Sequence, residues 1–254
     1  MGALYDRADI YDLMDSEDKH QVTREHWRRV LEGRQVHTLL DVSVGSGNLT
    51  LPLAPLGLQL YGSDLSQAML DKCRQNADAE NIAIDLRCCD FRQLTEHFTE
   101  RFDCVASSGN SLAYVTNSEV CTVLAQMDAL VRNGGYLYFD LRNWDKIRQN
   151  KERFYLYNPV FDGDTRIHLM QVWDHLEDGS INFNLLYTFE QNNRIVQKEH
   201  FIEHYHPVSR QFLIDKLSDM GYERIETLQF PTQFGSFDPE TADWYCVIAR
   251  KRDS

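Results

Sequence analysis

Glycines that follow an apolar run are the first candidates for ligand binding. Residues 41–47, DVSVGSG, place Asp41, Gly45 and Gly47 in the pattern D-x-x-x-G-x-G. Glycines at the turn from a strand to a helix let the backbone approach a ligand closely, and ligands collect at that point of α/β proteins. A tight turn without a ligand is the alternative. Thr50 stands where the dinucleotide-binding pattern G-x-G-x-x-G has its third glycine, which disfavours an NAD-dependent oxidoreductase.

Two further acids follow apolar runs and could complete a nucleotide site. Asp64 ends LYGSD, about twenty residues beyond the glycines, where an acid can accept hydrogen bonds from ribose hydroxyls. Asp90 ends CCD, where its carboxylate could accept a hydrogen bond from the amino group of adenine while Phe91 packs on the ring. A solvated acid in a turn is the alternative for Asp64. Acids at three successive strand ends predict a pocket for an adenosyl group.

Alternating apolar and amphipathic stretches position these residues. Residues 17–33 predict a helix that ends near Gly33, ahead of the first strand. Strand-like runs then alternate with helical patterns, which is typical of a parallel sheet with crossover helices. The helical pattern of residues 118–135 is predicted to end at Gly134 and Gly135. The strands are expected at residues 37–44, 58–65, 84–90, 102–109 and 136–143.

The periodicity changes to two after Trp144, which predicts a meander of antiparallel strands. A helix with Ser209 as its N-cap and two last strands complete the chain. The fold class is therefore α/β, a doubly wound, seven-stranded, mostly parallel Rossmann-like sheet with an antiparallel three-stranded insertion after the fifth strand. The strands of the insertion are expected at residues 166–176, 180–190 and 194–206, joined at Asp178-Gly179 and Asn192-Asn193.

Bulk composition narrows the partners. The chain has 254 residues, of which 43% are hydrophobic and 26% charged, the balance of a globular protein. A formal net charge of −13 without a basic patch argues against nucleic acid and favours a small-molecule substrate. No apolar run approaches the ~20 residues that span a bilayer, so we expect no membrane partner. Six cysteines without a C-x-x-C pair are expected to be buried reduced thiols, which indicates a cytoplasmic protein.

Longer segments resemble a known family. Residues 35–140 and 209–250 are similar to class I S-adenosylmethionine-dependent methyltransferases, and within that class to the glycine and sarcosine N-methyltransferases. The segments that carry the resemblance are SGNSLAYV at 108–115, VRNGGYLYFDLRNWDKI at 131–147 and EHYHP at 203–207. It implies one methyltransferase domain with S-adenosyl-L-methionine as cofactor, and it leaves open a homo-oligomer. The implied parts are an N-terminal helical cap (1–34), a cofactor-binding core (35–145), a substrate-covering insertion (146–208) and the last helix and strands (209–254).

The resemblance also implies roles for single residues. Gly45 and Gly47 would surround the aminoacid part of the cofactor, Asp64 its ribose, and Asp90 with Phe91 its adenine. Ser108 would lie beside the cofactor through its backbone. Tyr5 and Tyr11 resemble an aromatic segment that closes over the sulfonium, since a cation is attracted to an aromatic face. The cofactor-binding residues expected on this basis are Tyr11, Asp41, Gly45, Gly47, Asp64, Leu65, Asp90, Phe91 and Ser108.

Asn110, Arg142 and Tyr205 are the residues that the resemblance assigns to the acceptor. Arg142 matches an arginine that pairs with a substrate carboxylate, which suits the planar fork of a guanidinium. A salt bridge with Asp140 or Asp145 is the alternative for Arg142. The alternatives for the other two are a turn residue and a partly buried strand aromatic.

The acceptor itself stays open, because Tyr114 stands where the glycine enzymes have a histidine, and the glycine loop reads Ser-Val-Gly-Ser-Gly in place of Ala-Cys-Gly-Thr-Gly. An amine nitrogen of a carboxylate-bearing substrate is expected. The alternatives are the nitrogen or oxygen of a heterocycle, an amino sugar or another secondary metabolite, and a protein that binds S-adenosylmethionine without catalysis. Strand aromatics that could line a larger pocket, although core packing is their commoner role, are Trp173, Phe183, Tyr187 and Phe189.

Three histidines on one face of a predicted strand, His200, His204 and His206, could bind zinc. Half-exposed strand histidines are the commoner explanation. We therefore expect no metal site.

Overall fold

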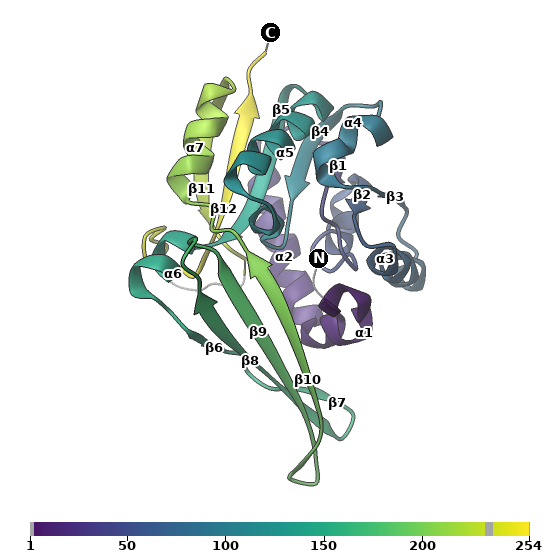
Figure 1. Ribbon diagram of the computed structural model, residues 1–254. Helices are drawn as coiled ribbons and strands as arrows, with labels where there is room; N and C mark the ends of the chain where they lie inside the picture. The colour runs from purple at the N-terminus through teal and green to yellow at the C-terminus, as the bar shows by residue number, and fades with distance from the viewer. Residues whose placement is uncertain (1–2, 232–235, 254) are drawn as a thin grey trace.

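The computed structural model describes residues 3–231 and 236–253, and its centre is a seven-stranded sheet in the order β11-β12-β5-β4-β1-β2-β3 (Figure 1). Strands β1 to β5 run parallel, whereas β12 is antiparallel to both β5 and β11. The predicted doubly wound, mostly parallel sheet is confirmed. The bounds are β1 Thr38–Asp41, β2 Gln59–Asp64, β3 Ile84–Cys88, β4 Phe102–Ser107, β5 Val131–Arg142, β11 Tyr222–Gln229 and β12 Trp244–Lys251.

Helices cover both faces of this sheet. α4 (Leu94–His97), α5 (Asn117–Leu130) and α7 (Arg210–Asp219) pack on one face, in a core that includes Val105, Leu137 and Val247. α2 (Glu17–Leu31) and the 3-10 helix η3 (Leu51–Leu56) pack on the other face, and α3 (Gln67–Glu80) packs beside η3. Side chains cap the helices, since Ser16, Ser66, Thr116 and Ser209 each accept a hydrogen bond from a main-chain N–H in the first turn. The predicted cap at Ser209 is confirmed.

The end of α5 differs from the prediction. The helix stops at Leu130, and Gly134 and Gly135 lie inside β5, which begins at Val131 and pairs there with Phe102. A Cβ at Gly135 would lie 2.8 Å from the main-chain oxygen of Asp103. The glycines therefore allow a close approach of two strands at a register shift, and the prediction that they terminate the helix is wrong.

A second, five-stranded sheet follows β5 and α6 (Trp144–Asn150) in the order β10-β9-β8-β6, with β7 on β8. The three long antiparallel strands were predicted, and both residues of the Asn192-Asn193 turn have positive φ, as a tight hairpin requires. The two short strands β6 and β7 are additional to the prediction. The bounds are β6 Phe154–Leu156, β7 Val160–Asp162, β8 Thr165–His175, β9 Ile181–Gln191 and β10 Arg194–Tyr205.

The N-terminal segment, residues 3–14, joins the two sheets. It consists of η1 (Ala3–Asp6), α1 (Ala8–Tyr11) and η2 (Asp12–Met14), which contact α3 as well as β10 and β7. Figure 1 shows α1 between α3 and the long strands of the second sheet. The segment therefore lies over the carboxyl ends of the central strands, where the candidate ligand-binding residues are.

The exposure of the cysteines differs from the prediction. All six cysteines are free thiols, but Cys88 and Cys121 are exposed, so the expectation that all are buried is wrong. Cys88 ends the edge strand β3, and Cys121 is on the outer side of α5.

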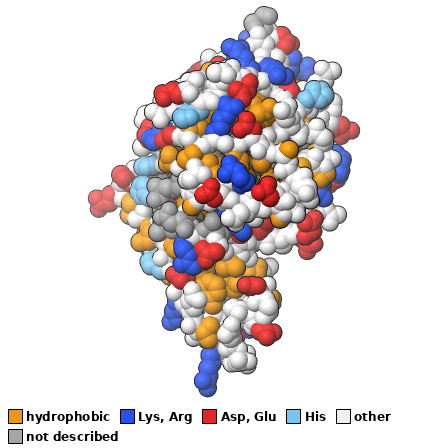
Figure 2. Space-filling model, turned by 90° about the vertical axis from the view of Figure 1, so that its right-hand side faces the viewer, with side chains coloured by type: hydrophobic (Ala, Val, Ile, Leu, Met, Phe, Trp, Pro, Cys, Tyr) orange, Lys and Arg blue, Asp and Glu red, His pale blue; other side chains and the backbone are white. Residues whose placement is uncertain are grey.

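Figure 2 shows Lys and Arg side chains interspersed with Asp and Glu on the face that it presents. Among the described helices, none is long and apolar enough to cross a lipid bilayer.

Candidate active site

The largest hollow at the site, which we call the main cavity, has a volume of about 460 Å³ and lies at the carboxyl ends of β1, β2 and β3. Such a volume falls within the ~300–1,000 Å³ of small-molecule sites. The predicted cofactor residues Asp64, Leu65, Asp90 and Phe91 all line it. Further lining residues come from the N-terminal segment, from the turn after β4 and from β10, namely Tyr5, Ser111, Tyr114, Ile202, Glu203 and His204.

A small hollow of about 30 Å³ adjoins the main cavity under Tyr5 and Tyr11. Gly45, Asp64 and Ser108 line it, and Asp64 lines both hollows. Seven of the nine expected cofactor residues therefore lie around the two adjoining hollows, namely Tyr11, Gly45, Asp64, Leu65, Asp90, Phe91 and Ser108. Gly47 does not line either hollow but shapes the loop. Its φ is +93°, and a Cβ there would lie 2.6 Å from Cδ1 of Leu51. A side chain at this position is therefore excluded.

Asp64 is fixed by main-chain donors. Its Oδ2 accepts a hydrogen bond from the N–H of Gly45 at 3.0 Å, and its Oδ1 accepts one from the N–H of Ser66 at 2.8 Å. Burial raises the pKa of this carboxyl group, and the two main-chain donors partly offset that effect. Each oxygen keeps acceptor capacity toward the cavity. The residue can therefore bind ligand hydroxyls without losing the contacts that hold it.

Asp41 occupies a different position from Asp64. Its Oδ2 accepts hydrogen bonds from Oγ1 of Thr50 and Oγ of Ser108, both at 2.6 Å, and Oδ1 accepts one from the N–H of Ser43 at 3.1 Å. The residue is 1% exposed and lies outside the main cavity. Asp41 thus ties the glycine loop to the end of β4, and a direct cofactor contact stays a prediction.

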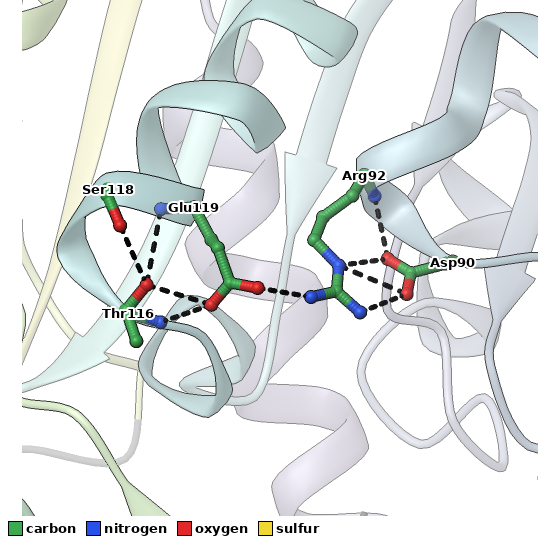
Figure 3. Close-up of polar contacts among 5 residues, drawn as sticks. All are labelled: Asp90, Arg92, Thr116, Ser118 and Glu119. Carbon is green, nitrogen blue, oxygen red and sulfur yellow. Dashed lines mark hydrogen bonds and ion pairs between the residues drawn. The ribbon is translucent and has the colours of Figure 1, made fainter.

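Asp90 forms an ion pair with Arg92, which was not predicted from the sequence (Figure 3). Nε of Arg92 donates to Oδ1 of Asp90 at 3.0 Å, Nη2 donates to Oδ2 at 2.6 Å, and the N–H of Arg92 donates to Oδ1 at 2.8 Å. The hydrogen bond from Arg92 is the main cause that lowers the pKa of Asp90. Nη1 of Arg92 also bonds Glu119 of α5, which closes the capping box with Thr116. A ligand amino group would have to share Asp90 with Arg92.

Arg142 is buried in an aromatic enclosure. The last residue of β5 is 6% exposed, and its guanidinium carbon lies 4.6 Å from the ring centre of Trp244 and 5.3 Å from that of Trp173. Nη2 donates hydrogen bonds to the hydroxyl of Tyr157 at 3.0 Å and to Oε1 of Gln171 at 3.4 Å. Both partners are neutral, and they come from β8 and from the residue directly after β6, so the segment that follows α6 helps to enclose the cation.

The alternative of a salt bridge between Arg142 and Asp140 or Asp145 is wrong. Asp140 instead accepts from the N–H of Gly109 at 2.7 Å, and Asp145 accepts from the N–H of Arg210 at 3.0 Å. Within residues 3–231 and 236–253, no carboxylate forms an ion pair with Arg142. A buried cation is costly unless an anion accompanies it. The arrangement is therefore suited to an anionic ligand group.

A chain of three hydroxyl groups lies between the main cavity and the aromatic enclosure. The hydroxyl of Tyr114 is 2.7 Å from that of Tyr5 and 2.7 Å from that of Tyr205. Burial raises the phenol pKa of all three. Tyr205 also packs on the ring of Phe183, with 4.7 Å between the ring centres. Tyr205 is thus linked to the cavity by its hydrogen bond with Tyr114, which lines the cavity.

Asn110 is 2% exposed and lies behind the cavity wall. Its Oδ1 accepts hydrogen bonds from the N–H of Arg142 at 3.1 Å and from Nε1 of Trp144 at 3.0 Å. The structure therefore brings together two groups of predicted residues. One surrounds the cavity, and the other, Asn110, Arg142 and Tyr205, lies one layer behind it.

Three further site residues were not identified from the sequence, and one of them had no local signal. Asp12 is one, since its Oδ1 accepts from Oγ of Ser46 at 2.6 Å and from Nδ2 of Asn48 at 2.9 Å, which anchors the N-terminal segment to the glycine loop. Gln171 could have been noticed as a polar residue on the apolar face of a period-two strand. Arg92 could have been noticed because it lies only two residues after Asp90 and carries the opposite charge.

Two of the three histidines make hydrogen bonds with neighbouring asparagines, and the ring of His206 packs against that of His204. His200 bonds Oδ1 of Asn184 at 3.1 Å, and His204 bonds Oδ1 of Asn182 at 2.7 Å. In the described part of the chain, no group of three or more His, Cys, Asp or Glu side chains is placed to hold a metal ion.

Residues 39–135 match the family model of a methyltransferase domain. The chain is 26% identical, over 99% of its length, to a glycine/sarcosine/dimethylglycine N-methyltransferase of Actinopolyspora halophila, and it spans 42% of that protein. It is also 26% identical, over 89% of its length, to a glycine/sarcosine N-methyltransferase of Aphanothece halophytica, and it spans 81% of that protein. The fold is similar to that of S-adenosylmethionine-bound CalS10, an amino pentose methyltransferase of Micromonospora echinaspora, with a TM-score of 0.73, 15% identity and coverage of 96% and 95% of the two chains.

Proposed function

Because this chain belongs to the class I S-adenosylmethionine-dependent methyltransferases, we propose that it methylates the amine nitrogen of a small acceptor that carries a carboxylate. The observation that carries the proposal is the buried Arg142, whose polar partners are both neutral. A carboxylate on the acceptor would supply the missing negative charge.

The hollows fit the cofactor. A connected space with Asp64, Asp90 and Phe91 on its larger side suits an adenosyl group, and the glycine loop with Tyr11 borders the smaller side, where the aminoacid part would lie. S-adenosylmethionine, when bound, supplies a methyl group that is activated by a positively charged sulfur. The aromatic faces of Tyr5 and Tyr11, whose ring centres are 5.6 Å apart, would be attracted to that charge.

The chain's own residues then have to orient the acceptor. Arg142 would hold the carboxylate, with Tyr157 and Gln171 fixing the guanidinium. The hydroxyls of Tyr114 and Tyr205 lie between Arg142 and the cavity and would border the amine. Positioning of a reactive amine against an activated methyl group can supply most of the catalysis in such a displacement.

Matched acceptor pairs test the proposal. Transfer of a labelled methyl group would be measured with glycine against methylamine and with sarcosine against dimethylamine, since each pair differs by the carboxylate. A charge-assisted hydrogen bond is worth about 1.5–3 kcal/mol, so kcat/KM should favour the amino acid by at least about tenfold. Equal values within both pairs would refute a carboxylate-reading site.

An amino sugar is the second candidate acceptor. Its support is the aromatic inner face of the second sheet, where Trp173 and Phe183 stack with 4.5 Å between their ring centres, together with the fold shared with CalS10. Sugars commonly pack against such faces, and a sugar needs no carboxylate partner. Activity on an amino pentose but on none of the amino acids would favour this candidate over the first.

A further inference from the structure

A buried carboxylate in the main cavity has no role in the function proposed so far. Glu203 is 1% exposed and lies on β10, on the face of the second sheet that is turned toward the main sheet. In the sheet it is opposite Phe183, which is opposite Trp173. On the three long strands this face is otherwise lined almost entirely by apolar and aromatic buried side chains, with Gln171 as the other buried polar residue. Among the buried residues described on this face, Glu203 is the one with a charged side chain, and it lies at the wall of a cavity, which points to a function.

The cavity wall around Glu203 is the one that an acceptor would meet. Glu203 lines the main cavity together with Tyr5 and Tyr114, and Asp90 and Phe91 line the same cavity. The adenosyl residues and Glu203 thus border one space, in which the methyl group and its acceptor would lie. Glu203 begins the segment EHYHP, but no role was assigned to it from the sequence.

Glu203 and Arg142 are both neighbours of Phe183. Glu203 is opposite Phe183 in the sheet, and the guanidinium carbon of Arg142 lies 5.4 Å from the ring centre of Phe183, which is itself 4.7 Å from that of Tyr205. A free amino acid carries the opposite pair of charges, a carboxylate and an ammonium group. The two protein charges therefore match the two ends of a zwitterion.

We propose that Glu203 binds the ammonium group of the acceptor and takes up its proton before methyl transfer. This inference rests on the proposed function, and it narrows the acceptor to a zwitterionic amino acid. One N–H bond of the ammonium breaks and its proton moves to a carboxylate oxygen of Glu203. The freed lone pair forms the N–C bond while the S–C bond breaks, and the sulfur keeps that electron pair as a neutral thioether. The methylated ammonium leaves, and Glu203 releases its proton to solvent.

Glu203→Gln is the direct test, because it keeps the shape of the side chain and removes its charge. We expect the affinity for S-adenosylhomocysteine, measured by calorimetry, to stay within about twofold of the wild type. The KM of the amine should rise by at least about tenfold, as for the loss of one charge-assisted hydrogen bond. The remaining activity should increase toward high pH, because the amine must then lose its proton in solution, at a pKa near that of a free amine of about 10.

Two further variants complete the test. Glu199→Gln is the matched control, since Glu199 lies four residues away on the same face of β10 but outside the cavity, in an ion pair with Arg7. It should behave like the wild type. Glu203→Asp keeps the charge and should keep the wild-type pH profile with a lower kcat, and it also serves if the Gln variant does not fold.

Two results would overturn the inference. One is a pH profile and amine KM in Glu203→Gln that equal those of the wild type. The other is a loss of affinity for S-adenosylmethionine but not for S-adenosylhomocysteine, which would place Glu203 against the sulfonium. Each measurement is made with glycine and with methylamine. A lack of carboxylate preference in the wild type refutes the proposed function, and with it the zwitterionic acceptor, whereas the effect of Glu203→Gln on methylamine still tests whether Glu203 binds the ammonium group and takes up its proton.

Discussion

The main-chain N–H of Arg142 donates a hydrogen bond to Oδ1 of Asn110 at 3.1 Å. The same oxygen accepts a hydrogen bond from Nε1 of Trp144 at 3.0 Å, and Asn110 itself has φ +66°, in the left-handed region that asparagine tolerates better than most residues. One buried side chain therefore joins the turn after β4 to the end of β5 and to the start of α6. We propose that Asn110 positions Arg142 from behind, in addition to the substrate contact that the sequence resemblance implies.

Asn110→Ala should destabilise the protein through this junction. Two buried donors would lose their acceptor, at about 1–3 kcal/mol for each group left without a hydrogen bond. Asn81→Ala is the matched control, because Asn81 also has positive φ, +55°, but lies exposed at the end of α3. We expect the free energy of unfolding in urea to fall by at least about 2 kcal/mol more for Asn110→Ala than for Asn81→Ala. Equal losses would show that backbone strain alone is involved.

Asp64→Asn should weaken cofactor binding. The neutral amide can still accept one main-chain hydrogen bond, but it loses the charge that strengthens bonds to ligand hydroxyls. Calorimetry with S-adenosylhomocysteine should give a dissociation constant about ten to a hundred times that of the wild type, which corresponds to about 1.5–3 kcal/mol. Asp71→Asn, an exposed site on α3, should leave the constant unchanged. An unchanged constant for Asp64→Asn would exclude Asp64 from ribose binding.

Arg92→Ala tests whether Asp90 contacts adenine. Arg92 occupies both oxygens of Asp90, so its removal frees the acceptor for a ligand amino group. We expect S-adenosylhomocysteine to bind several-fold more tightly to the variant. Arg87→Ala is the control, because Arg87 also bridges two acids, Asp85 and Glu100, but lies outside the main cavity. Weaker binding by Arg92→Ala would mean that the ion pair holds Asp90 in its binding position.

Asp140 should make stability depend on pH. Burial, with the nearby charge of Asp41, raises the pKa of Asp140 to about 7, while its hydrogen bonds from Gly109 and Asn110 act in the opposite direction. The folded state therefore binds the proton more tightly than the unfolded state. The stabilisation from this group is complete below the unfolded pKa of about 3.9 and is lost as the pH rises through about 7.

Asp140→Asn removes this titration but keeps an acceptor for the N–H of Gly109. The drop in Tm between pH 5 and pH 8 should therefore be smaller in the variant than in the wild type. Thermal unfolding followed by circular dichroism at several pH values measures the difference. A steeper drop in the variant would contradict the raised pKa.

Local sequence patterns predicted those features of the fold and the site that depend on residues close together in the chain. The strands and helices of the main sheet, the loop with Gly45 and Gly47, and the acids Asp64 and Asp90 follow from periodicity and from the position of strand ends. The two glycines after α5 were misread because glycine marks both helix ends and close strand contacts, and the choice depends on the pairing of Val131 with Phe102.

Contacts between the two sheets could not be predicted in the same way. The enclosure of Arg142 by Tyr157 and Gln171, and the placement of Glu203 in the cavity wall, depend on how the second sheet folds back on the first. The registers of β8, β9 and β10 decide which alternate residues face inward. A single sequence indicates that inward-facing and outward-facing side chains alternate along such strands, but it does not indicate which surface the strands pack against.

The role of Arg142 can be tested most directly by comparing carboxylate preference in the wild type and in Arg142→Gln. The measured quantity is the ratio of kcat/KM for glycine to that for methylamine, with the affinity for S-adenosylhomocysteine as a check on the cofactor site. The account predicts a ratio of at least about ten in the wild type that falls toward one in the variant, with unchanged affinity. A ratio that stays the same in both proteins would contradict the account.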